Sequence, residues 1–514
     1  MRRIDLPYTY TIPFLESPRR RAALLAVILS LYLGFALATA RTSRPDGDEA
    51  GYANPSYNLA FHGFMGTTIY GEQGALRVGS MPRHTYWMPP LYFLANVPFF
   101  KLFGFGLAQV RSTAMLWGLT AMAAWYVLIR TGGNSPALAI LAAGFIGLGY
   151  FFQLSAALGR MDMMCLALGT CGIAAYCLLR RVCLPGAVLA GNALVAASCL
   201  THATGMMYFF GLGFLMLDCD WKRLRAPHVA LAALPYLLGA AAWGAYIRAD
   251  VAGFLEQTRG SLNQARGANG VPPGFSPVGS LRQEIIRRYV NSFGLGPGMP
   301  LANRSKSIVL LAYCAGLAGS LCIGRIRRDP LVRVLLILAA IDFAVLAFIA
   351  PSKNYYYLPH TTAVFSACLA ITVLRAPKPG GWGQSLAVLA LAALAGLQLA
   401  GLASRDHQRL LQKSYLPAIE AIRQYSKPGD LIFGPVALWL SLQPDRELLD
   451  DWKLGYASGR RGSVIVLDPM KREVMEDARL EKSPAYSWAK RLIEDSRKAY
   501  DDGYYAVYVP PPSR

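Results

Sequence analysis

The stretch AALLAVILSLYLGFALATA, residues 22–40, contains no charged side chain and is long enough to cross a lipid bilayer as one helix. Three arginines, at positions 19–21, precede it. The run is longer, and its polar leader more extended, than in a cleaved signal peptide, so we expect a retained first span. Of the 514 residues, 54% are hydrophobic and 16% are charged, whereas a soluble chain has about 25% charged residues. The composition therefore indicates a polytopic membrane protein.

Further apolar runs follow along the chain and bring the prediction to about 11 spans. They are 107–129, 136–154, 161–179, 184–200, 204–217, 228–247, 307–324, 334–350, 355–374 and 385–403. The run 204–217 is short and rich in glycine. We expect an α-helical membrane module over residues 1–404.

The charge pattern predicts the topology of these spans. Lys and Arg number 51 against 30 Asp and Glu, a net charge of +21. Basic residues gather in alternate short loops, at 130, 180–181, 222–225, 325–328 and 375–378. By the positive-inside rule these loops and the N-terminus are cytoplasmic, whereas loops 41–106 and 248–306 lie outside. The surplus charge therefore reflects topology and does not indicate a nucleic-acid partner.

Residues 405–514 have a different composition, with acids nearly balancing bases. The stretches 430–434, 463–468 and 504–509 predict short strands, and 415–426 and 484–500 predict amphipathic helices. An odd number of spans makes this a small extracytoplasmic α/β domain. The 9 cysteines lie in or beside predicted spans, so no disulfide framework is expected, and no Cys/His spacing suggests zinc.

The first outer loop concentrates acids just beyond a span, at Asp46, Asp48 and Glu49. These carboxylates repel one another unless water, a cation or a base is shared between them. One interpretation is a solvated loop in which Asp48 caps a helix that starts near Glu49. The other is a catalytic or binding site.

Other polar residues are predicted on the same side of the membrane. Arg160 and Asp162 either anchor the end of a span or face an outer cavity with Asp48. Lys353 lies beside three tyrosines and either meets a phosphate or belongs to an aromatic belt. His202 is a ligand candidate or a helix-packing histidine. Asp342 lies within a span, so we expect it to face the bundle interior, either as a coupling site or in a structural hydrogen bond.

The order of these motifs resembles the GT-C superfamily of integral-membrane glycosyltransferases. The resemblance rests on Asp48-Glu49-Ala-Gly-Tyr52, Trp87-Met-Pro-Pro-Leu-Tyr92, Phe99-Phe-Lys-Leu-Phe-Gly104, Arg111, Arg160-Met-Asp162 and Tyr355-Tyr-Tyr-Leu-Pro359. It is strongest over residues 40–180. The bacterial relatives of protein O-mannosyltransferases and the lipid A aminoarabinose transferases are the most similar branch.

The resemblance implies transfer of a sugar from a polyprenyl-phosphate donor to an acceptor hydroxyl, at the outer face of a bacterial inner membrane. It implies that Asp48 is the general base, although Asp46 is an alternative. Attack opposite the leaving group predicts inversion. The further expected site residues are Glu49 and Asp162 for positioning, Arg160 and Lys353 for the donor phosphate, and Tyr52, His84, Tyr86, His202 and Tyr356 for substrate binding.

No cofactor is required by the sequence, and one divalent cation on Asp46, Asp48 and Glu49 is an open alternative. The acceptor is a lipid, a polysaccharide or a protein. The rival hypotheses are a secondary transporter or flippase of lipid-linked sugars, with Asp342 as its coupling site, and a structural subunit with a degenerate site. Transporters commonly contain paired repeats, and the sequence shows no internal repeat.

Overall fold

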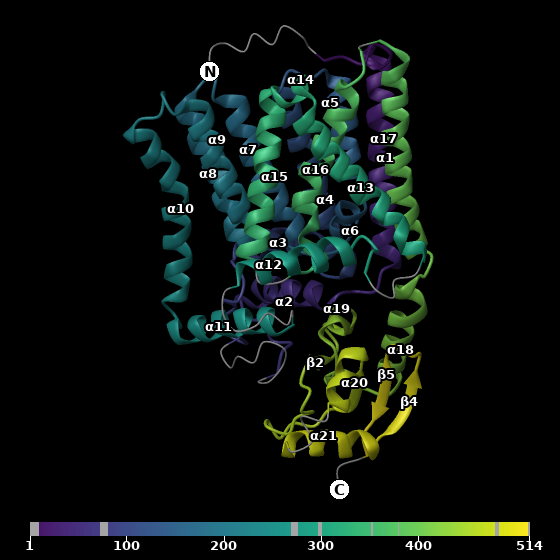
Figure 1. The fold of residues 1–514 in the computed structure, drawn as a ribbon. Helices are drawn as coiled ribbons and strands as arrows, with labels where there is room; N and C mark the ends of the chain where they lie inside the picture. Colours follow the sequence, from purple (N-terminus) through teal and green to yellow (C-terminus); the bar gives the residue numbers. More distant parts are fainter. Residues whose placement is uncertain are drawn as a thin grey trace.

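The structure, a computed structural model, describes residues 10–71, 81–268, 276–296, 301–350, 353–378, 380–477 and 483–511. Parts of both predicted long outer loops, 72–80 and 269–275, lie outside the described residues. The chain folds into a bundle of long apolar helices followed by a smaller region that contains a β-sheet (Figure 1). The predicted membrane protein with a small C-terminal α/β region is confirmed.

Among the described residues, 9 helices are long and apolar enough to cross a membrane. They are α1 (Pro18–Thr42), α4 (Leu107–Thr131), α7 (Asp162–Leu179), α8 (Leu184–Thr201), α10 (Ala226–Ile247), α13 (Leu301–Cys322), α15 (Pro330–Phe348), α16 (Leu358–Arg375) and α17 (Trp382–Asp406). The predicted run 136–154 forms two helices, α5 (Pro136–Gly147) and α6 (Tyr150–Ala157), bent by 67°. Counting this pair as one span gives 10.

The predicted run 204–217 corresponds to α9 (Met206–Asp220), which has only 15 residues. The total of about 11 spans therefore stays a prediction. The most enclosed helix is α16, which is buried along nearly its whole length, whereas α10 has no buried residue and stands at the edge of the bundle (Figure 1). Asp342 in α15 is 4% exposed, so its predicted position in the bundle interior is confirmed.

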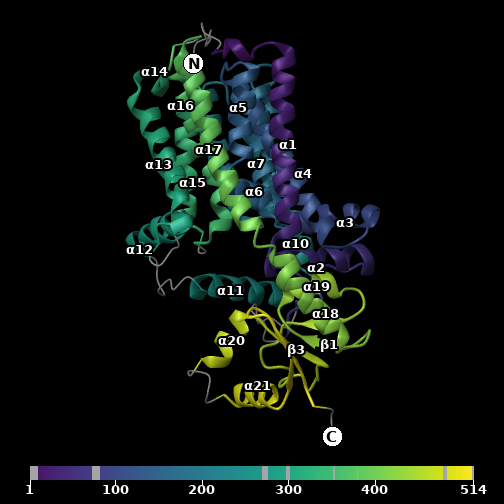
Figure 2. The ribbon, with the colours of Figure 1, turned by 90° about the vertical axis from the view of Figure 1, so that its right-hand side faces the viewer.

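Shorter helices lie across one end of the bundle, next to the C-terminal region (Figure 2). They are α2 (Gly47–His62), α3 (Leu91–Phe103), α11 (Val251–Ala268), α12 (Pro277–Gln283) and the π-helix Glu284–Asn291. We call this the site end. Helix α3 is apolar but has only 13 residues, which is too short to cross a bilayer.

The C-terminal region contains a five-stranded sheet of order β2-β1-β3-β5-β4. Strands β1 (Leu431–Phe433), β2 (Glu447–Leu449) and β3 (Val464–Leu467) are parallel, and β5 (Ala506–Val509) is antiparallel to β3 and to β4 (Arg497–Asp501). Every residue of β1 and β3 is buried. The helices around the sheet are α18 (Leu416–Gln424), α19 (Trp439–Leu442), α20 (Pro469–Glu476) and α21 (Pro484–Glu494).

Three strands and one helix of this region follow the predictions, and one prediction is partly wrong. The stretch 484–500 is not one helix, because α21 ends at Glu494 and residues 497–501 form β4. This edge strand gains its backbone hydrogen bonds from β5, a partner that local helical periodicity does not reveal. Strand β2 was not predicted, although β1, which has the same length of 3 residues, was.

Aromatic packing fastens the C-terminal region to the site end. The Trp439 ring lies 5.5 Å from the Tyr57 ring of α2 and 5.2 Å from the Phe105 ring before α4. Trp439 is 1% exposed. A buried aromatic side chain of this size contributes strongly to an interface, so the sheet is held against α2.

Candidate active site

The first turn of α2 carries the acidic sequence Asp46-Gly-Asp48-Glu49. The Asp48 N–H donates to Asp46 Oδ1 at 2.8 Å, and the Asp46 N–H donates to Glu49 Oε2 at 2.9 Å. This reciprocal pair is a capping box, which satisfies N–H groups that a helix start otherwise leaves free. The interpretation that Asp48 caps the helix is therefore wrong, because Asp46 takes that position. The Asp48 carboxylate is available for other contacts.

Glu49 forms an enclosed ion pair with Arg111 of α4. Arg111 Nε and Nη2 each donate to one carboxylate oxygen at 2.9 Å, and neither side chain is more than 1% exposed. The Gly159 N–H donates to the same carboxylate at 2.8 Å. Burial acts to raise the pKa of Glu49, but Arg111 and the backbone donors outweigh it, so this pKa lies below its usual value. Glu49 thus fastens α2 to α4 and to the loop before α7.

Arg160 brings together acids from two distant segments. It lies in the loop before α7 and its side chain is 2% exposed. Nη1 donates to Asp48 Oδ2, Nε donates to Asp162 Oδ2 at 2.9 Å, and Nη1 lies 4.0 Å from Asp46 Oδ1. The guanidinium carbon also lies 3.7 Å from the centre of the Tyr356 ring, a cation–π contact. We call these five residues the Arg160 cluster.

The acids of the Arg160 cluster differ in their accessibility. The Asp48 side chain is 43% exposed, that of Asp46 is 26% exposed and that of Asp162 is 1% exposed. Asp48 is therefore the most solvent-accessible carboxylate of the cluster. Asp162 Oδ1 is buried and has no hydrogen-bond partner among the described residues. Such a group costs about 1–3 kcal/mol unless a ligand or water binds it.

Tyr356 and Tyr52 form two walls of the cluster. The Tyr356 hydroxyl donates to Asp46 Oδ2. Burial and the neighbouring Asp48 charge raise the pKa of Asp46 above its usual value, against the opposing effect of Arg160. The Tyr52 ring centre lies 5.7 Å from the Arg160 guanidinium carbon, and burial followed by Asp48 raises the pKa of Tyr52 well above its usual value. Both predicted tyrosines therefore lie in the site as neutral, aromatic neighbours of Arg160.

His84 and Tyr86 lie farther away, against α10 and α11. Their rings are stacked with centres 5.7 Å apart, and the Tyr86 ring lies 5.1 Å from that of Tyr246. Gln257 accepts a hydrogen bond from the Tyr86 N–H at 2.7 Å. The neighbouring Trp87 ring stacks on Tyr52, with ring centres 5.5 Å apart. The contacts of His84 and Tyr86 are thus with α10 and α11, and these two residues are not members of the Arg160 cluster.

His202 lies between α8 and α9, close enough to Asp162 to interact electrostatically. Its Nδ1 accepts a hydrogen bond from the Thr204 N–H at 3.1 Å and caps a 3-10 turn (Ala203–Gly205). The His202 ring centre lies 5.4 Å from that of Tyr357. Burial lowers the pKa of His202 below its usual value, so the ring is neutral at pH 7. These contacts give it a packing and capping role beside the cluster.

Lys353 lies at the end of α15. Its ammonium donates to the carbonyls of Leu346 and Ala347 at 2.6 and 2.8 Å and lies 3.2 Å from Glu284 Oε2. A cation is favourable at a helix C-terminus. Glu284 is also paired with Arg288 at 2.6 Å. Lys353 thus joins the end of α15 to the π-helix, and its contact with a donor phosphate stays a prediction.

The carboxyl ends of the parallel strands close over the start of α2. A Cβ atom on Gly47 would lie 3.3 Å from Val436, which follows β1. The N–H of Asp450, which follows β2, donates to the Ile69 carbonyl at 2.8 Å. The Arg44 guanidinium carbon lies 3.2 Å from the Tyr504 ring centre. The C-terminal region therefore forms one wall above the Arg160 cluster.

The geometry bears on the possible divalent cation. No group of three or more His, Cys, Asp or Glu side chains in the described ranges is placed to hold a metal ion. Glu49 is directed to Arg111, and Asp46 and Asp48 are directed to Arg160. These contacts would have to break before the three acids bound one ion, so the structure provides no support for that alternative.

Sequence reasoning gave no role to three residues of the site. Arg111 appears in a motif, and its charge at the start of a predicted span was the available signal that it needs a carboxylate partner. The Tyr70 hydroxyl packs against Gly51 of α2, where a Cβ atom would lie 2.9 Å from it. Tyr504 belongs to a predicted strand end. No local pattern connects Tyr70 or Tyr504 to α2, since both contacts depend on the tertiary fold.

No protein-family model matches the sequence, and no curated protein matches it at a significant level. Solved structures do match. The structure superposes on that of ArnT from Cupriavidus metallidurans in the apo state with a TM-score of 0.62 and 14% identity, covering 96% of this chain and 99% of that chain. ArnT bound to undecaprenyl phosphate gives 0.60 and 14%, covering 96% and 98%.

A third match extends the same class. The Archaeoglobus fulgidus oligosaccharyltransferase, in complex with Zn and sulfate, gives a TM-score of 0.52 and 13% identity, covering 94% of this chain and 73% of that chain. The chain therefore has the fold of the GT-C membrane glycosyltransferases, as the sequence motifs predicted. Within that class its fold resembles ArnT over nearly the full length of both chains.

Proposed function

We propose that this protein is a membrane glycosyltransferase that moves a sugar from a polyprenyl-phosphate donor to an acceptor hydroxyl. The Arg160 cluster carries the proposal, because it joins an accessible carboxylate to a buried arginine and a second, incompletely hydrogen-bonded carboxylate. The similarity to an ArnT that binds undecaprenyl phosphate supports a lipid-phosphate donor. The reaction face is the extracytoplasmic side of a bacterial inner membrane, with the N-terminus in the cytoplasm.

Asp48 is the proposed general base. The acceptor hydroxyl oxygen attacks the anomeric carbon, the bond from that carbon to the phosphate oxygen breaks, and the electron pair leaves with the polyprenyl phosphate. The hydroxyl proton passes to the Asp48 carboxylate, which needs to lie within about 3 Å of it. Because the leaving group is a phosphate, no separate strong acid is required. Attack from the opposite face inverts the configuration at the anomeric carbon.

The charge of the Arg160 cluster suits the sugar better than the phosphate. One arginine faces three carboxylates, Asp46, Asp48 and Asp162. This excess negative charge stabilises the positive charge that develops at the anomeric centre in an oxocarbenium-like transition state. Arg160 orients the base, and Asp162 Oδ1 accepts a hydrogen bond from a sugar hydroxyl. The donor phosphate then needs additional cations, for which Lys353 is the predicted candidate.

A transfer assay tests this function. Purified protein in nanodiscs is supplied with a panel of polyprenyl-phosphate sugars, and sugar transfer and release of polyprenyl phosphate are followed. We expect Asp48→Asn to reduce turnover by about 10²–10⁴-fold with unchanged thermal stability. Asp445→Asn, an exposed acid of the C-terminal region, is the matched control.

Full turnover by Asp48→Asn overturns the assignment of the base. The absence of transfer and hydrolysis with every donor in the panel overturns the glycosyltransferase. Inversion is tested by assigning the anomeric configuration of the product against that of the donor. Asp342→Asn separates the rival transporter, since a coupled transporter depends on that carboxyl, whereas this mechanism does not use it.

A further inference from the structure

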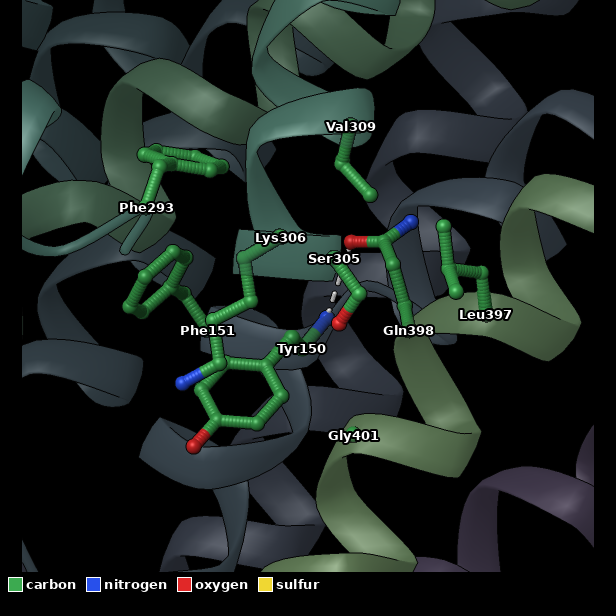
Figure 3. Close-up of a pocket in the computed structure, with 9 residues that line it drawn as sticks. All are labelled: Tyr150, Phe151, Phe293, Ser305, Lys306, Val309, Leu397, Gln398 and Gly401. Atoms are coloured by element: carbon green, nitrogen blue, oxygen red, sulfur yellow. Dashed lines mark hydrogen bonds between the residues drawn. The ribbon is translucent and has the colours of Figure 1, made fainter. Parts of the chain in front are cut away.

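The pocket between α6, α13 and α17 is too small for a substrate (Figure 3). It has room for about 10 Å³, which is the space of one water molecule. Gln398 Oε1 accepts a hydrogen bond from the Tyr150 N–H at 3.0 Å, whereas Gln398 Nε2 has no partner in the described ranges. A single water satisfies that donor. The residues that join the C-terminal region to α2 leave a different set of donors unpaired.

A segment of the first outer loop joins the edge of the C-terminal sheet beside α2. The Asp450 N–H donates to the Ile69 carbonyl at 2.8 Å, and the Gly71 N–H donates to the Asp450 carbonyl at 3.2 Å. These bonds pair Tyr70 with Asp450 as a parallel bridge just after β2. Backbone pairing fixes the direction in which a side chain leaves a strand. The sheet therefore sets the direction of the Tyr70 side chain.

Tyr70 brings an unpaired hydroxyl close to the proposed base. The hydroxyl packs against Gly51 of α2, and Tyr70 interacts electrostatically with both Asp48 and Asp46. Burial, followed by the Asp48 charge, raises the pKa of Tyr70 well above its usual value, so the hydroxyl is protonated at pH 7. Among the residues that the structure describes, it has no hydrogen-bond partner. A tyrosine hydroxyl both donates and accepts, so this group is free to bind a substrate hydroxyl.

A second donor comes from Lys471 of α20. Its side chain is 9% exposed, and its ammonium donates to the Asp450 carboxylate. An ammonium carries three N–H donors, and in the part of the chain that the structure describes the other two have no partner. A largely buried donor without an acceptor is costly, so an oxygen of a ligand or of water is favourable beside Lys471.

Electrostatic contacts connect these residues with two more of the C-terminal region. Asp468 interacts with Lys471, and Tyr504 interacts with both Asp468 and Asp46. The set thus begins and ends at the acids of α2. We call it the outer polar group, and its members are Tyr70, Asp450, Asp468, Lys471 and Tyr504.

We propose that the outer polar group binds the acceptor of the transfer and that this acceptor is a sugar. The inference rests on the proposed function, since it places the acceptor beside Asp48. The Tyr70 hydroxyl and the Lys471 ammonium donate to sugar oxygens next to the hydroxyl that Asp48 deprotonates. A sugar presents several hydroxyls on neighbouring carbons, each a donor and an acceptor, which matches the mixture of donors and acceptors in the group. The side chain of a serine or threonine in a protein presents only one.

The charge of this region restricts the acceptor further. Four carboxylates lie in or beside the outer polar group, against two cations. They are Asp46, Asp48, Asp450 and Asp468, against Lys471 and Arg44. Like charges at an interface cost free energy, so the sugar carries no anionic group next to its reacting hydroxyl. Such a sugar belongs either to a polysaccharide or to the headgroup of a glycolipid.

Competition between acceptor and water tests the site. Purified protein in nanodiscs is supplied with a labelled polyprenyl-phosphate sugar and with one of three envelope fractions of the source organism, namely aqueous polysaccharide, organic-phase glycolipid or delipidated protein. Sugar transfer and donor hydrolysis are measured together. Water does not need the outer polar group, so loss of acceptor binding lowers the ratio of transfer to hydrolysis. General damage to the fold lowers both reactions in parallel and leaves the ratio unchanged.

Three variants address the group. Tyr70→Phe removes only the hydroxyl, and we expect the ratio to fall about 2- to 10-fold, as for the loss of one hydrogen bond. Gly51→Ala keeps the hydroxyl but places a Cβ atom 2.9 Å from it, so the hydroxyl has to move and a similar fall is expected. Lys471→Gln removes a charged donor and should lower the ratio about 10-fold or more. The controls are Tyr456→Phe and Lys490→Gln, exposed residues of the same region, which should match the wild type.

The outcomes separate this site from the proposed function. Transfer to the aqueous fraction assigns the acceptor to a polysaccharide, and transfer to the organic fraction, with the label on a sugar, assigns it to a glycolipid. Transfer to protein alone, or hydrolysis without transfer to any fraction, overturns the sugar acceptor. A wild-type ratio in Tyr70→Phe, Gly51→Ala and Lys471→Gln overturns the outer polar group as its site. If the wild type neither transfers nor hydrolyses any donor, the glycosyltransferase itself is overturned.

Discussion

Two arginine–carboxylate clusters start from adjacent residues of α2 and differ in how far their carboxylates are enclosed. On one side, Glu49 and Arg111 are at most 1% exposed and share two hydrogen bonds of 2.9 Å. On the other side, Arg160 is equally buried, but its partner Asp48 is 43% exposed. The first pair is enclosed by protein, whereas the second opens on one side to solvent.

The difference concerns how completely each cluster is hydrogen-bonded. A buried ion pair repays its desolvation only when its remaining donors and acceptors also find partners. The Glu49 carboxylate accepts hydrogen bonds from two backbone N–H groups in addition to those from Arg111. Both of its oxygens are therefore hydrogen-bonded within the protein. In the Arg160 cluster, one oxygen of Asp162 has no partner in the described part of the chain. We infer that the enclosed pair holds the fold and that the incomplete cluster is built for a ligand.

The largest expected effect is on the enclosed pair. Arg111→Gln leaves the Glu49 carboxylate buried and unpaired, and we expect a loss of about 3–5 kcal/mol of stability. A large fall in thermal midpoint in detergent, or failure to accumulate in the membrane, measures it. The exposed pair Arg460–Glu447 is the control, because its side chains are 43% and 49% exposed and Arg460→Gln should change stability by less than about 1 kcal/mol. Equal effects of the two variants would contradict the comparison.

The next effect separates stability from turnover. Arg160→Gln removes the cation that orients Asp48 and Asp162, and we expect turnover to fall about 10²–10³-fold, as for the loss of a preorganised electrostatic contact. Stability should fall less than in Arg111→Gln, because Asp48 can turn to solvent. Steady-state transfer rates and thermal midpoints of both variants measure the two effects. Intact turnover in a strongly destabilised Arg160→Gln would reverse the proposed roles of the two arginines.

Much of this architecture follows from the sequence, because membrane spans are read from apolar length and loop charge. The acids of the first loop and Arg160-Met-Asp162 were also predicted to meet, on the argument that they lie on one side of the membrane. The resemblance gives Asp48 and Glu49 different roles, but which of the two is enclosed by protein was not predictable. The two acids are neighbours with the same charge, and only the position of Arg111 relative to α2 shows which one is enclosed.

Other parts of the site depend on contacts that have no local signal. Lys353 beside its tyrosines predicts either a phosphate contact or an aromatic belt, and no local pattern predicts that it also caps α15 and meets Glu284. The helix predicted at 484–500 is split because β5 supplies a strand partner for 497–501. In each case the partner is remote in sequence, and its geometry is set by packing of the whole bundle or sheet.

A smaller effect, on the pH dependence of stability, tests whether the His202 ring is enclosed by protein or in contact with solvent. Burial lowers its pKa in the folded protein, so the unfolded chain binds a proton at a higher pH than the folded chain does. Stability is therefore lost as the pH falls below about 6.5, by up to about 1.4 kcal/mol per pH unit for one proton. His202→Asn keeps a capping side chain without titrating, so its thermal midpoint should depend less on pH.

The control for His202 is His62→Asn, an exposed histidine at the end of α2. This variant should retain the wild-type dependence of the thermal midpoint on pH. An identical pH dependence in wild type, His202→Asn and His62→Asn would show that His202 is in contact with solvent and belongs to the open side of the site.

The smallest effect concerns Tyr356, which touches the open cluster in two ways. Tyr356→Phe removes the hydroxyl that donates to Asp46 but keeps the ring 3.7 Å from the Arg160 guanidinium carbon. One hydrogen bond is worth about 0.5–1.5 kcal/mol, so turnover should fall about 2- to 10-fold. Tyr356→Ala also removes the cation–π contact and should be more strongly impaired than Tyr356→Phe in the same transfer assay. If both variants lose turnover equally, the hydroxyl alone matters and Arg160 is held by its carboxylates. If Tyr356→Phe is unimpaired, Asp46 acts only as the cap of α2, and the open cluster acts through Asp48 and Asp162.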